Sequence, residues 1–255
     1  GIVAPTVQDY IDAGVTGVDN ANLNAVNAEV DAVTKPQADT VAEVQALANI
    51  GNQKADEALE KIADYAEDGS NAKPTAQDYI DAGVTGVNNT NAEAINSAIE
   101  MQGGTDNTPG NTDDRTAVDT PVKIQTIVDA YQTIFGAADG VADNAPAPSQ
   151  SDYTTVGVIG MDDEDELSLL GDVVDAQSMA GVDSVAKVQA LADAVQSVMD
   201  AAAGAANKPT VEELTKLGIT GASSSTIALV QAAIAGTLDD GSEVNSMSAL
   251  QAIVN

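Results

Sequence analysis

The chain has 255 residues, with 40 Asp or Glu against nine Lys or Arg, which gives a formal net charge of −31. It contains neither Cys nor His, and this excludes disulfide bonds, zinc fingers, His-ligated metals and catalysis through Ser-His-Asp or Cys-His pairs. Because so acidic a surface repels phosphate backbones and anionic lipids, we expect neither nucleic acid nor membrane insertion.

Two short phrases recur along the chain in a fixed order. The opening phrase, PTVQDYIDAGVTGV at residues 5–18, returns almost unchanged at 74–87, and eroded copies start at Ser149 and Pro209. The second phrase, VQAL at residues 44–47, is echoed at 124–127, 188–191 and 250–253. Self-similarity within one chain indicates a repeat architecture, here with an interval of roughly 60 to 75 residues.

The phrases define four predicted repeats. Repeat 1 covers residues 1–73, repeat 2 covers 74–148 with a loop insertion at 103–118, repeat 3 covers 149–208 and repeat 4 covers 209–255. Linkers rich in Gly, Asn and Pro mark their junctions. Repeat 4 stops early in its third helix, so we expect it to be truncated. The chain starts without Met or a signal peptide, so we expect a piece of something longer.

Each repeat predicts a short first helix that opens with a capping box. A hydroxyl accepts a hydrogen bond from the backbone three residues on, while the carboxylate there reaches back. The pairs are Thr6 with Asp9, Thr75 with Asp78, Ser149 with Asp152, and Thr210 with Glu213. Glycines in the left-handed conformation are then expected to end these helices, at Gly14, Gly83, Gly157 and Gly218.

Two further helices are predicted in each repeat. The second starts near residues 19–20, 89–90, 162–163 and 223–224, with apolar residues at spacings of three and four, such as Leu23, Val26 and Val30. The third starts near residues 39–40, 120–121, 183–184 and 246. No segment alternates like a β-strand. We therefore expect an all-α fold, an elongated tandem array of small three-helix bundles that depend on contacts with their neighbours.

The pattern resembles the repeats of known surface proteins. The residues that carry the resemblance are Tyr10-x3-Gly14-Val15, Asn22-Leu23-x2-Val26-Asn27 and Thr40-Val41-x2-Val44-Gln45-Ala46-Leu47. They are similar to the tandem helical repeats of giant bacterial adhesin-like surface proteins and, more distantly, to the three-helix albumin-binding (GA) modules. The resemblance implies a segment of a cell-surface or secreted array, whose partners would be other repeats of the parent protein, neighbouring copies, or a host or cell-surface protein. It assigns no binding residue.

Acidic residues in two loops are candidates for Ca²⁺, which prefers six to eight oxygen ligands. The candidates are Asp106, Asp113, Asp114, Asp239, Asp240 and Glu243. Their spacing matches no strict calcium loop, so ordinary turn chemistry is favoured, and we expect no required cofactor. The run Asp162-Asp163-Glu164-Asp165-Glu166 stands at a predicted helix start, where carboxylates oppose the helix dipole. We interpret this run as a cap or solvated face.

Two recurring side chains have competing interpretations. Tyr10, Tyr79 and Tyr153 share one repeat position, and its exchange for Leu214 in repeat 4 favours core packing over chemistry. A glutamine recurs early in the third helix, at Gln45, Gln125, Gln189 and Gln251. It either satisfies loop backbone groups or faces a partner, and the structural role is favoured.

The chain has little equipment for catalysis. A glycosidase-type carboxylate pair needs a cleft, usually with aromatic platforms, and the only aromatic residues are five Tyr and one Phe. We expect no enzyme, but a structural repeat region of a bacterial extracellular or cell-surface protein, acting as a spacer, stalk or adhesin segment. Two alternatives stay open: a self-assembling subunit of an extracellular filament or surface layer, and a helical module that binds a host protein.

Overall fold

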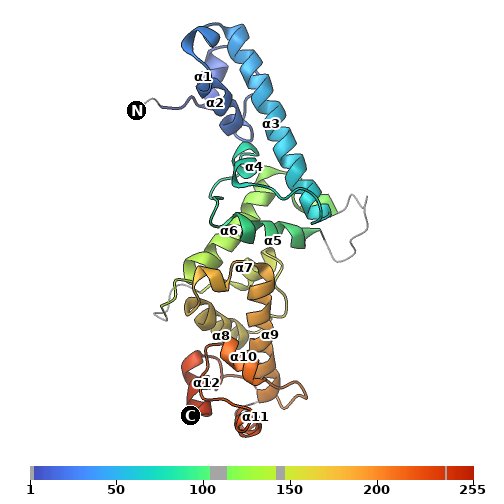
Figure 1. Ribbon diagram of the computed structural model, residues 1–255, viewed down its shortest axis with the longest axis vertical. Coiled ribbons are helices and arrows are strands. Elements are labelled where there is room, and N and C mark those ends of the chain that lie inside the picture. Colours follow the sequence, from blue (N-terminus) through green and yellow to red (C-terminus); the bar gives the residue numbers. More distant parts are fainter. Residues whose placement is uncertain (1–2, 104–113, 142–146, 239) are drawn as a thin grey trace. The chain divides into compact units, whose positions relative to one another are not determined.

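The computed structural model describes residues 3–103, 114–141, 147–238 and 240–255, and α-helices dominate these ranges (Figure 1). The described residues contain no β-strand, only an isolated bridge between Asp139 and Ser178. The expected all-α class is confirmed. Within the same ranges, no helix is both long and apolar enough to cross a membrane.

The chain divides into two compact units, Gly1–Asp129 and Ala130–Asn255. The division falls inside helix α6 (Pro121–Ala137). Repeat 1 and most of repeat 2 therefore belong to the first unit, and repeats 3 and 4 belong to the second.

In the first unit, repeat 1 contains α1 (Val7–Asp12), α2 (Leu23–Asp31), the 3-10 helix η1 (Lys35–Gln37) and α3 (Val41–Glu67). Repeat 2 contains α4 (Ala76–Asp81), α5 (Ala92–Gln102), η2 (Asp114–Ala117) and the start of α6. The second unit begins with the rest of α6.

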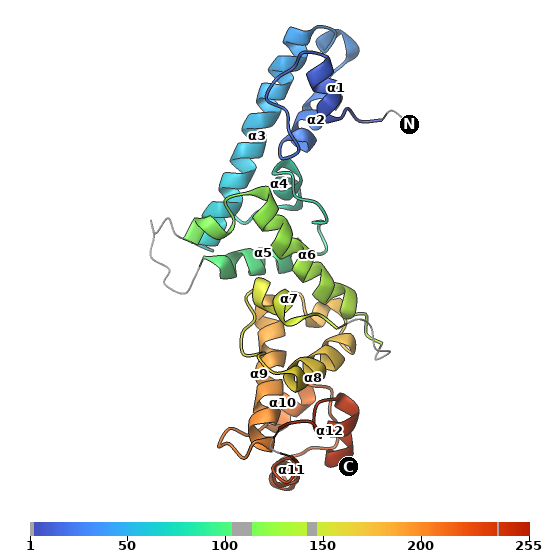
Figure 2. The same ribbon diagram turned by 180° about the vertical axis from the view of Figure 1, so that it is seen from behind.

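In the second unit, repeat 3 contains α7 (Gln150–Thr155), α8 (Glu164–Asp175), η3 (Met179–Gly181) and α9 (Val185–Ala202). Repeat 4 contains α10 (Val211–Lys216), α11 (Ile227–Ile234) and α12 (Met247–Val254). Figure 2 shows the same helices from behind.

The first helix of every repeat ends as the sequence predicts. In α1, the N–H of Gly14 donates to Ile11 O at 3.0 Å and the N–H of Val15 donates to Tyr10 O at 2.9 Å, which is the Schellman pattern. The glycine that follows the cap has a positive φ, 84° at Gly14, a conformation that side chains with a Cβ rarely adopt. Equivalent bonds and positive φ angles recur at Gly83, Gly157 and Gly218.

The second helices begin a few residues after the predicted position in repeats 1, 2 and 4. In repeat 1 the delay is caused by a side-chain turn. Asn22 Oδ1 accepts from the N–H of Asp19 at 2.9 Å, and Asn22 Nδ2 donates to Gly17 O at 2.8 Å. Because these bonds already satisfy the backbone in a non-helical form, α2 starts only at Leu23.

A tight turn that the sequence did not predict precedes each third helix. It forms η1, η2 and η3, and in repeat 4 it is a turn closed by the bond from Val244 N to Gly241 O, 2.9 Å long. The turn places an apolar residue two positions before the third helix's cap, and Val118, Val182 and Val244 are fully buried there. Part of the loop insertion expected at 103–118 is therefore ordered as η2 and contributes to the core.

The core is built from many small side chains and few large ones. Around repeat 1, Tyr10, Val15, Val18, Val26 and Ala48 form a buried cluster, with Leu23, Val30 and Val44 packed against it. The recurring tyrosine position is buried in every repeat, with exposures of 3 % at Tyr10 and 0 % at Tyr79, Tyr153 and Leu214. The interpretation of this position as core packing is confirmed.

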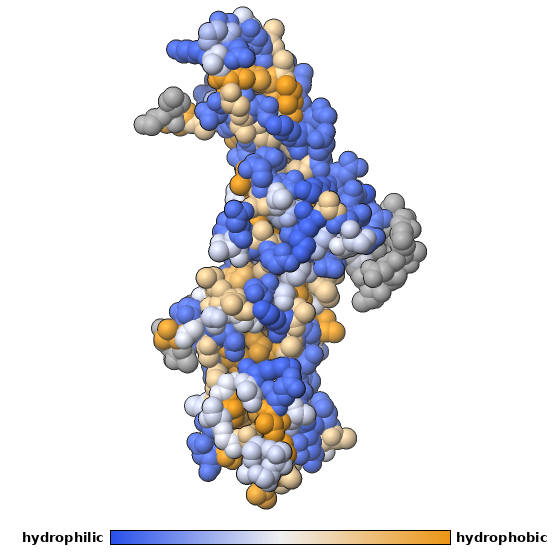
Figure 3. Space-filling view, viewed as in Figure 1, coloured by the Kyte–Doolittle hydropathy of each residue, from blue (hydrophilic) through white to orange (hydrophobic). Residues whose placement is uncertain are grey.

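Helices α3 and α9 each pack against two successive repeats. Helix α3 packs on α2 of its own repeat, and also on α4 and α5 of the next. Helix α9 likewise packs on α8, and also on α10 and α11. Gln53 and Glu57 of α3 are exposed, and the surface of α3 is hydrophilic over most of its length in Figure 3. One long helix thus joins the cores of neighbouring repeats within each unit.

Candidate functional site

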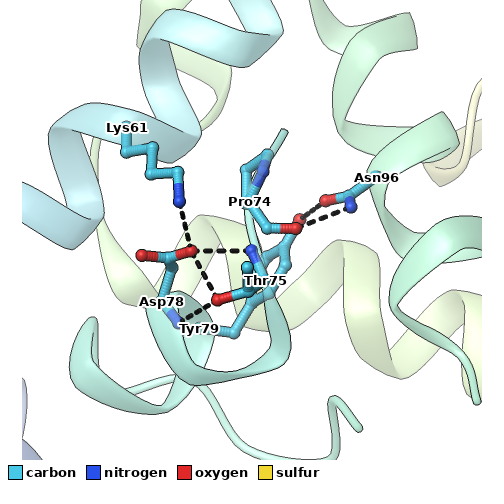
Figure 4. Close-up of polar contacts among 6 residues, drawn as sticks. All are labelled: Lys61, Pro74, Thr75, Asp78, Tyr79 and Asn96. Atoms are coloured by element: carbon cyan, nitrogen blue, oxygen red, sulfur yellow. Dashed lines mark hydrogen bonds and ion pairs between the residues drawn. The ribbon is translucent and has the colours of Figure 1, made fainter. Parts of the chain in front are cut away.

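A network of hydrogen bonds and an ion pair in the first unit surrounds the capping box of α4 (Figure 4). Asp78 Oδ2 accepts from the N–H of Thr75 at 2.7 Å, and Thr75 Oγ1 accepts from the N–H of Asp78 at 3.3 Å. Lys61 Nζ, which comes from α3, donates to the same Asp78 oxygen at 2.6 Å. An ion pair therefore joins α3 of repeat 1 to α4, the first helix of repeat 2.

The capping carboxylates Asp78 and Asp9 have lowered pKa values. Burial alone raises the pKa of Asp78, but hydrogen bonds from Lys61 and Thr75 outweigh it, so the pKa lies below its usual range. In repeat 1, the hydrogen bonds from the Thr6 side chain and backbone lower the pKa of Asp9. With a lowered pKa these carboxyl groups are ionised near neutral pH, and an ionised carboxylate has no proton to donate as a general acid. Both groups are suited to capping.

The recurring tyrosine is tied to the segment that enters each repeat. Tyr79 Oη donates to Asn96 Oδ1 at 2.6 Å, and Asn96 Nδ2 donates to Pro74 O at 2.8 Å. Tyr10, Asn27 and Pro5 form the same chain in repeat 1, at 2.7 and 2.9 Å. This link fixes the start of the first helix to the second helix in both repeats.

Repeats 3 and 4 depart from this link in different ways. In repeat 4, Leu214 has no hydroxyl, and Gln231 replaces the asparagine and still donates to Pro209 O at 2.9 Å. In repeat 3 the asparagine position holds Leu170, and the Tyr153 hydroxyl is buried with no hydrogen-bond partner among the described residues. Burial raises the pKa of Tyr153, so its hydroxyl keeps its proton.

The recurring glutamine forms two hydrogen bonds to the backbone of a loop in every repeat. Gln45 Oε1 accepts from the N–H of Thr16 at 2.8 Å, and Gln45 Nε2 donates to Thr16 O at 3.0 Å. The same pair of bonds joins Gln125 to Thr85, Gln189 to Ile159 and Gln251 to Thr220. The structural interpretation of this glutamine is therefore the one that its contacts support, since both ends of the amide are engaged within the chain.

Half of the calcium candidates can be located only in sequence. Asp106, Asp113 and Asp239 lie outside the described residues, and Asp114 is described only as the first residue of η2. Asp240 Oδ1 accepts from Ser242 Oγ at 2.7 Å and from Ser242 N at 3.1 Å, and these hydrogen bonds lower the pKa of Asp240. Glu243 Oε2 accepts from Leu238 N at 2.9 Å. These two residues thus stabilise the turn before α12.

The acidic run at 162–166 starts α8. Asp163 is its N-cap and forms a capping box with Glu166, whose Oε2 accepts from the N–H groups of Asp162 at 3.0 Å and Asp163 at 3.2 Å. Its interpretation as a cap agrees with these contacts. The fold also brings Asp163 and Glu166 together with Asp200 and Asp240 around a pocket of about 320 Å³, a grouping that the sequence did not predict.

Acidic side chains around this pocket already accept hydrogen bonds from other groups of the chain. Asp200 Oδ2 accepts from Asn207 Nδ2 at 2.8 Å, while Glu166 and Asp240 accept from the backbone. Within the described ranges, no group of three or more acidic side chains has the arrangement of a metal site. A larger cavity lies in the first unit and is an open groove of about 650 Å³ beside α2.

Comparisons with family models, with curated proteins and with solved structures find no match to this chain.

Proposed function

We propose that the chain is a non-catalytic structural repeat region of a bacterial extracellular or cell-surface protein and acts as a spacer or stalk, or as an adhesin segment. In this proposal its four repeats form a tandem array of small three-helix bundles in an elongated molecule. Its function is mechanical, because length and stiffness would hold a more distant part of the parent protein away from the surface.

The observation that carries the proposal is that each of the long helices α3 and α9 packs on two successive repeats. The first half of α3 packs on its own repeat, and the second half packs on the next, where Lys61 pairs with Asp78. Helix α9 has the same two sets of neighbours in the second unit. When each repeat depends mainly on its nearest neighbours, the chain behaves as a quasi-one-dimensional array.

The polar features also support a structural role. The capping carboxylates and the recurring glutamines are engaged in bonds to the backbone, and they hold the loops of each repeat in place. The net charge of −31 keeps such a chain soluble and disfavours association with other copies through self-repulsion.

Small-angle scattering combined with sedimentation velocity tests the proposal. A compact chain of 255 residues has a radius of gyration of about 18 Å. We expect a monomer with a clearly larger radius that does not change with concentration. A radius near the compact value would contradict the spacer function, and assemblies that grow with concentration would support the alternative of a self-assembling subunit.

A further inference from the structure

The first helices of repeats 1 and 2 have nearly the same sequence but different surroundings. Residues 5–18 and 74–87 differ only at Val7 and Ala76. Even so, Pro74 is buried and Ala82 is 1 % exposed, whereas Pro5 is half-buried and Ala13 is exposed. The second helices show the same contrast, since Ile99 is fully buried and its equivalent Val30 is half-buried.

Much of the difference comes from α3, which covers repeat 2, and α2 of repeat 1 also packs on α4. Ala58, Ile62 and Ala66 of α3 are buried at 4 %, 0 % and 3 % exposure, and α3 packs on α4 and α5. The approach is close, because a Cβ on Gly103 would lie 1.7 Å from the carbonyl oxygen of Ala66. Lys61 adds the ion pair to Asp78.

The same relation recurs in the second unit. Helix α9 packs on α10 and α11, and there Pro209 and Leu217 are buried, as Pro74 and Ala82 are in repeat 2. The covered face is therefore a regular feature of these repeats, and the third helix of the preceding repeat contributes most of its cover.

On repeat 1, the corresponding face is a groove. It has a volume of about 650 Å³ and is lined by Val3, Pro5, Asn27, Val30 and Ile80, among others. Asp9, the equivalent of Asp78, is exposed and has no ion pair with a Lys or Arg of the described residues.

We propose that this groove is a docking site for an amphipathic helix of the α3 type, carried by another repeat of the same kind. The helix would present small apolar residues with the spacing of Ala58, Ile62 and Ala66, and a lysine placed like Lys61 to pair with Asp9. The inference rests on the proposed function, because it assumes that such repeats stack. It adds the site, its partner and the residues that recognise it.

The test uses the full chain and a labelled peptide of residues 52–67, which is the half of α3 nearest repeat 2. A staple between positions 53 and 57, both exposed in α3, keeps this short helix folded. Fluorescence anisotropy is measured in about 0.5 M NaCl, where a Debye length of about 4 Å screens the repulsion between two acidic partners. A peptide with Ile62→Glu is the negative control.

Matched variants of the chain locate the site. Ala13→Glu places a carboxylate at the equivalent of Ala82, which the preceding repeat buries in repeat 2. Asn20→Glu adds the same charge at the equivalent of Asn89, which stays exposed in repeat 2. Because position 13 is exposed, both variants should fold, and circular dichroism checks this. Ala28→Glu, which also lines the groove, is a second variant should Ala13→Glu be misfolded.

We expect saturable binding of the peptide, weakened at least about tenfold by Ala13→Glu or Ala28→Glu and changed less than about twofold by Asn20→Glu. No saturable binding, equal binding by all variants, or binding of the Ile62→Glu peptide would overturn the docking site. Such a result would leave the spacer function standing, because scattering and sedimentation test that function separately.

Discussion

Removing one hydroxyl from equivalent positions of two repeats should have opposite effects on stability. Tyr79 and Tyr153 are both fully buried, and each follows a capping box in the first helix of its repeat. The Tyr79 hydroxyl donates to Asn96, which is 2 % exposed, while the Tyr153 hydroxyl has no partner among the described residues. Substitution by Phe keeps the ring and deletes only the hydroxyl.

The magnitudes follow from these contacts. Tyr79→Phe leaves the Asn96 oxygen buried and unsatisfied, which costs about 1–3 kcal/mol of unfolding free energy. Tyr153→Phe removes a buried polar group that has already lost its hydration, and should stabilise the protein by about 1 kcal/mol. Tyr10→Phe should fall nearer zero than Tyr79→Phe, because water can reach the partly buried Asn27.

Urea unfolding followed by far-ultraviolet circular dichroism measures the change in stability. Tyr79 and Tyr153 lie in different compact units that need not unfold together, so amide hydrogen exchange is needed to assign each change to its own unit. Equal destabilisation by Tyr79→Phe and Tyr153→Phe would refute the reasoning, since it would mean that the Tyr153 hydroxyl makes a hydrogen bond as valuable as that of Tyr79.

Three further substitutions test the other contacts. Gln125→Ala should destabilise the first unit by about 0.5–1.5 kcal/mol and speed hydrogen exchange at the Thr85 amide, which donates to the Gln125 side chain. Slow exchange at this amide in the variant would contradict the importance of that hydrogen bond. Gly51→Ala should destabilise by about 1–3 kcal/mol in urea unfolding despite the higher helix propensity of Ala, because the added Cβ would lie 2.6 Å from Val26 Cα; a gain in stability would contradict this close approach. Asp78→Asn should reduce stability above the unfolded-state pKa of about 4, and its gap to the parent chain should close as the pH falls through the lowered folded-state pKa. A gap in melting temperature that is unchanged from pH 7 to pH 2 would exclude this linkage.

The local features of each repeat could be predicted because they depend on a few neighbouring residues. The capping box of Thr75 and Asp78, the left-handed Gly83 and the start of α3 after Thr40 all lie where the sequence predicts them. Each involves hydrogen bonds within about one helical turn, so the residue type and spacing suffice. The 3-10 turns were missed because their sequences, such as Lys35-Pro36-Gln37, carry no periodic signal.

The polar links between helices were harder to predict. Gln45 and Thr16 are 29 residues apart, and Tyr79 and Asn96 are 17 apart, so only packing shows that they meet. A signal existed for the second pair, since an asparagine follows the tyrosine at the same distance in repeats 1 and 2. The grouping of Asp240 with Asp163 likewise joins segments that are distant in sequence.

The sequence alone determined that the chain is helical, where the short first helix of each repeat starts and stops, and which residues recur. Burial of the face between repeats was decided only by the tertiary structure, because two nearly identical segments have unlike surroundings. Ala82 is covered by the preceding repeat and Ala13 is exposed, although both stand in the same local sequence. Hydrogen bonds within a turn are fixed by the residues that form it, whereas removal of apolar surface from water requires a second surface that those residues do not encode.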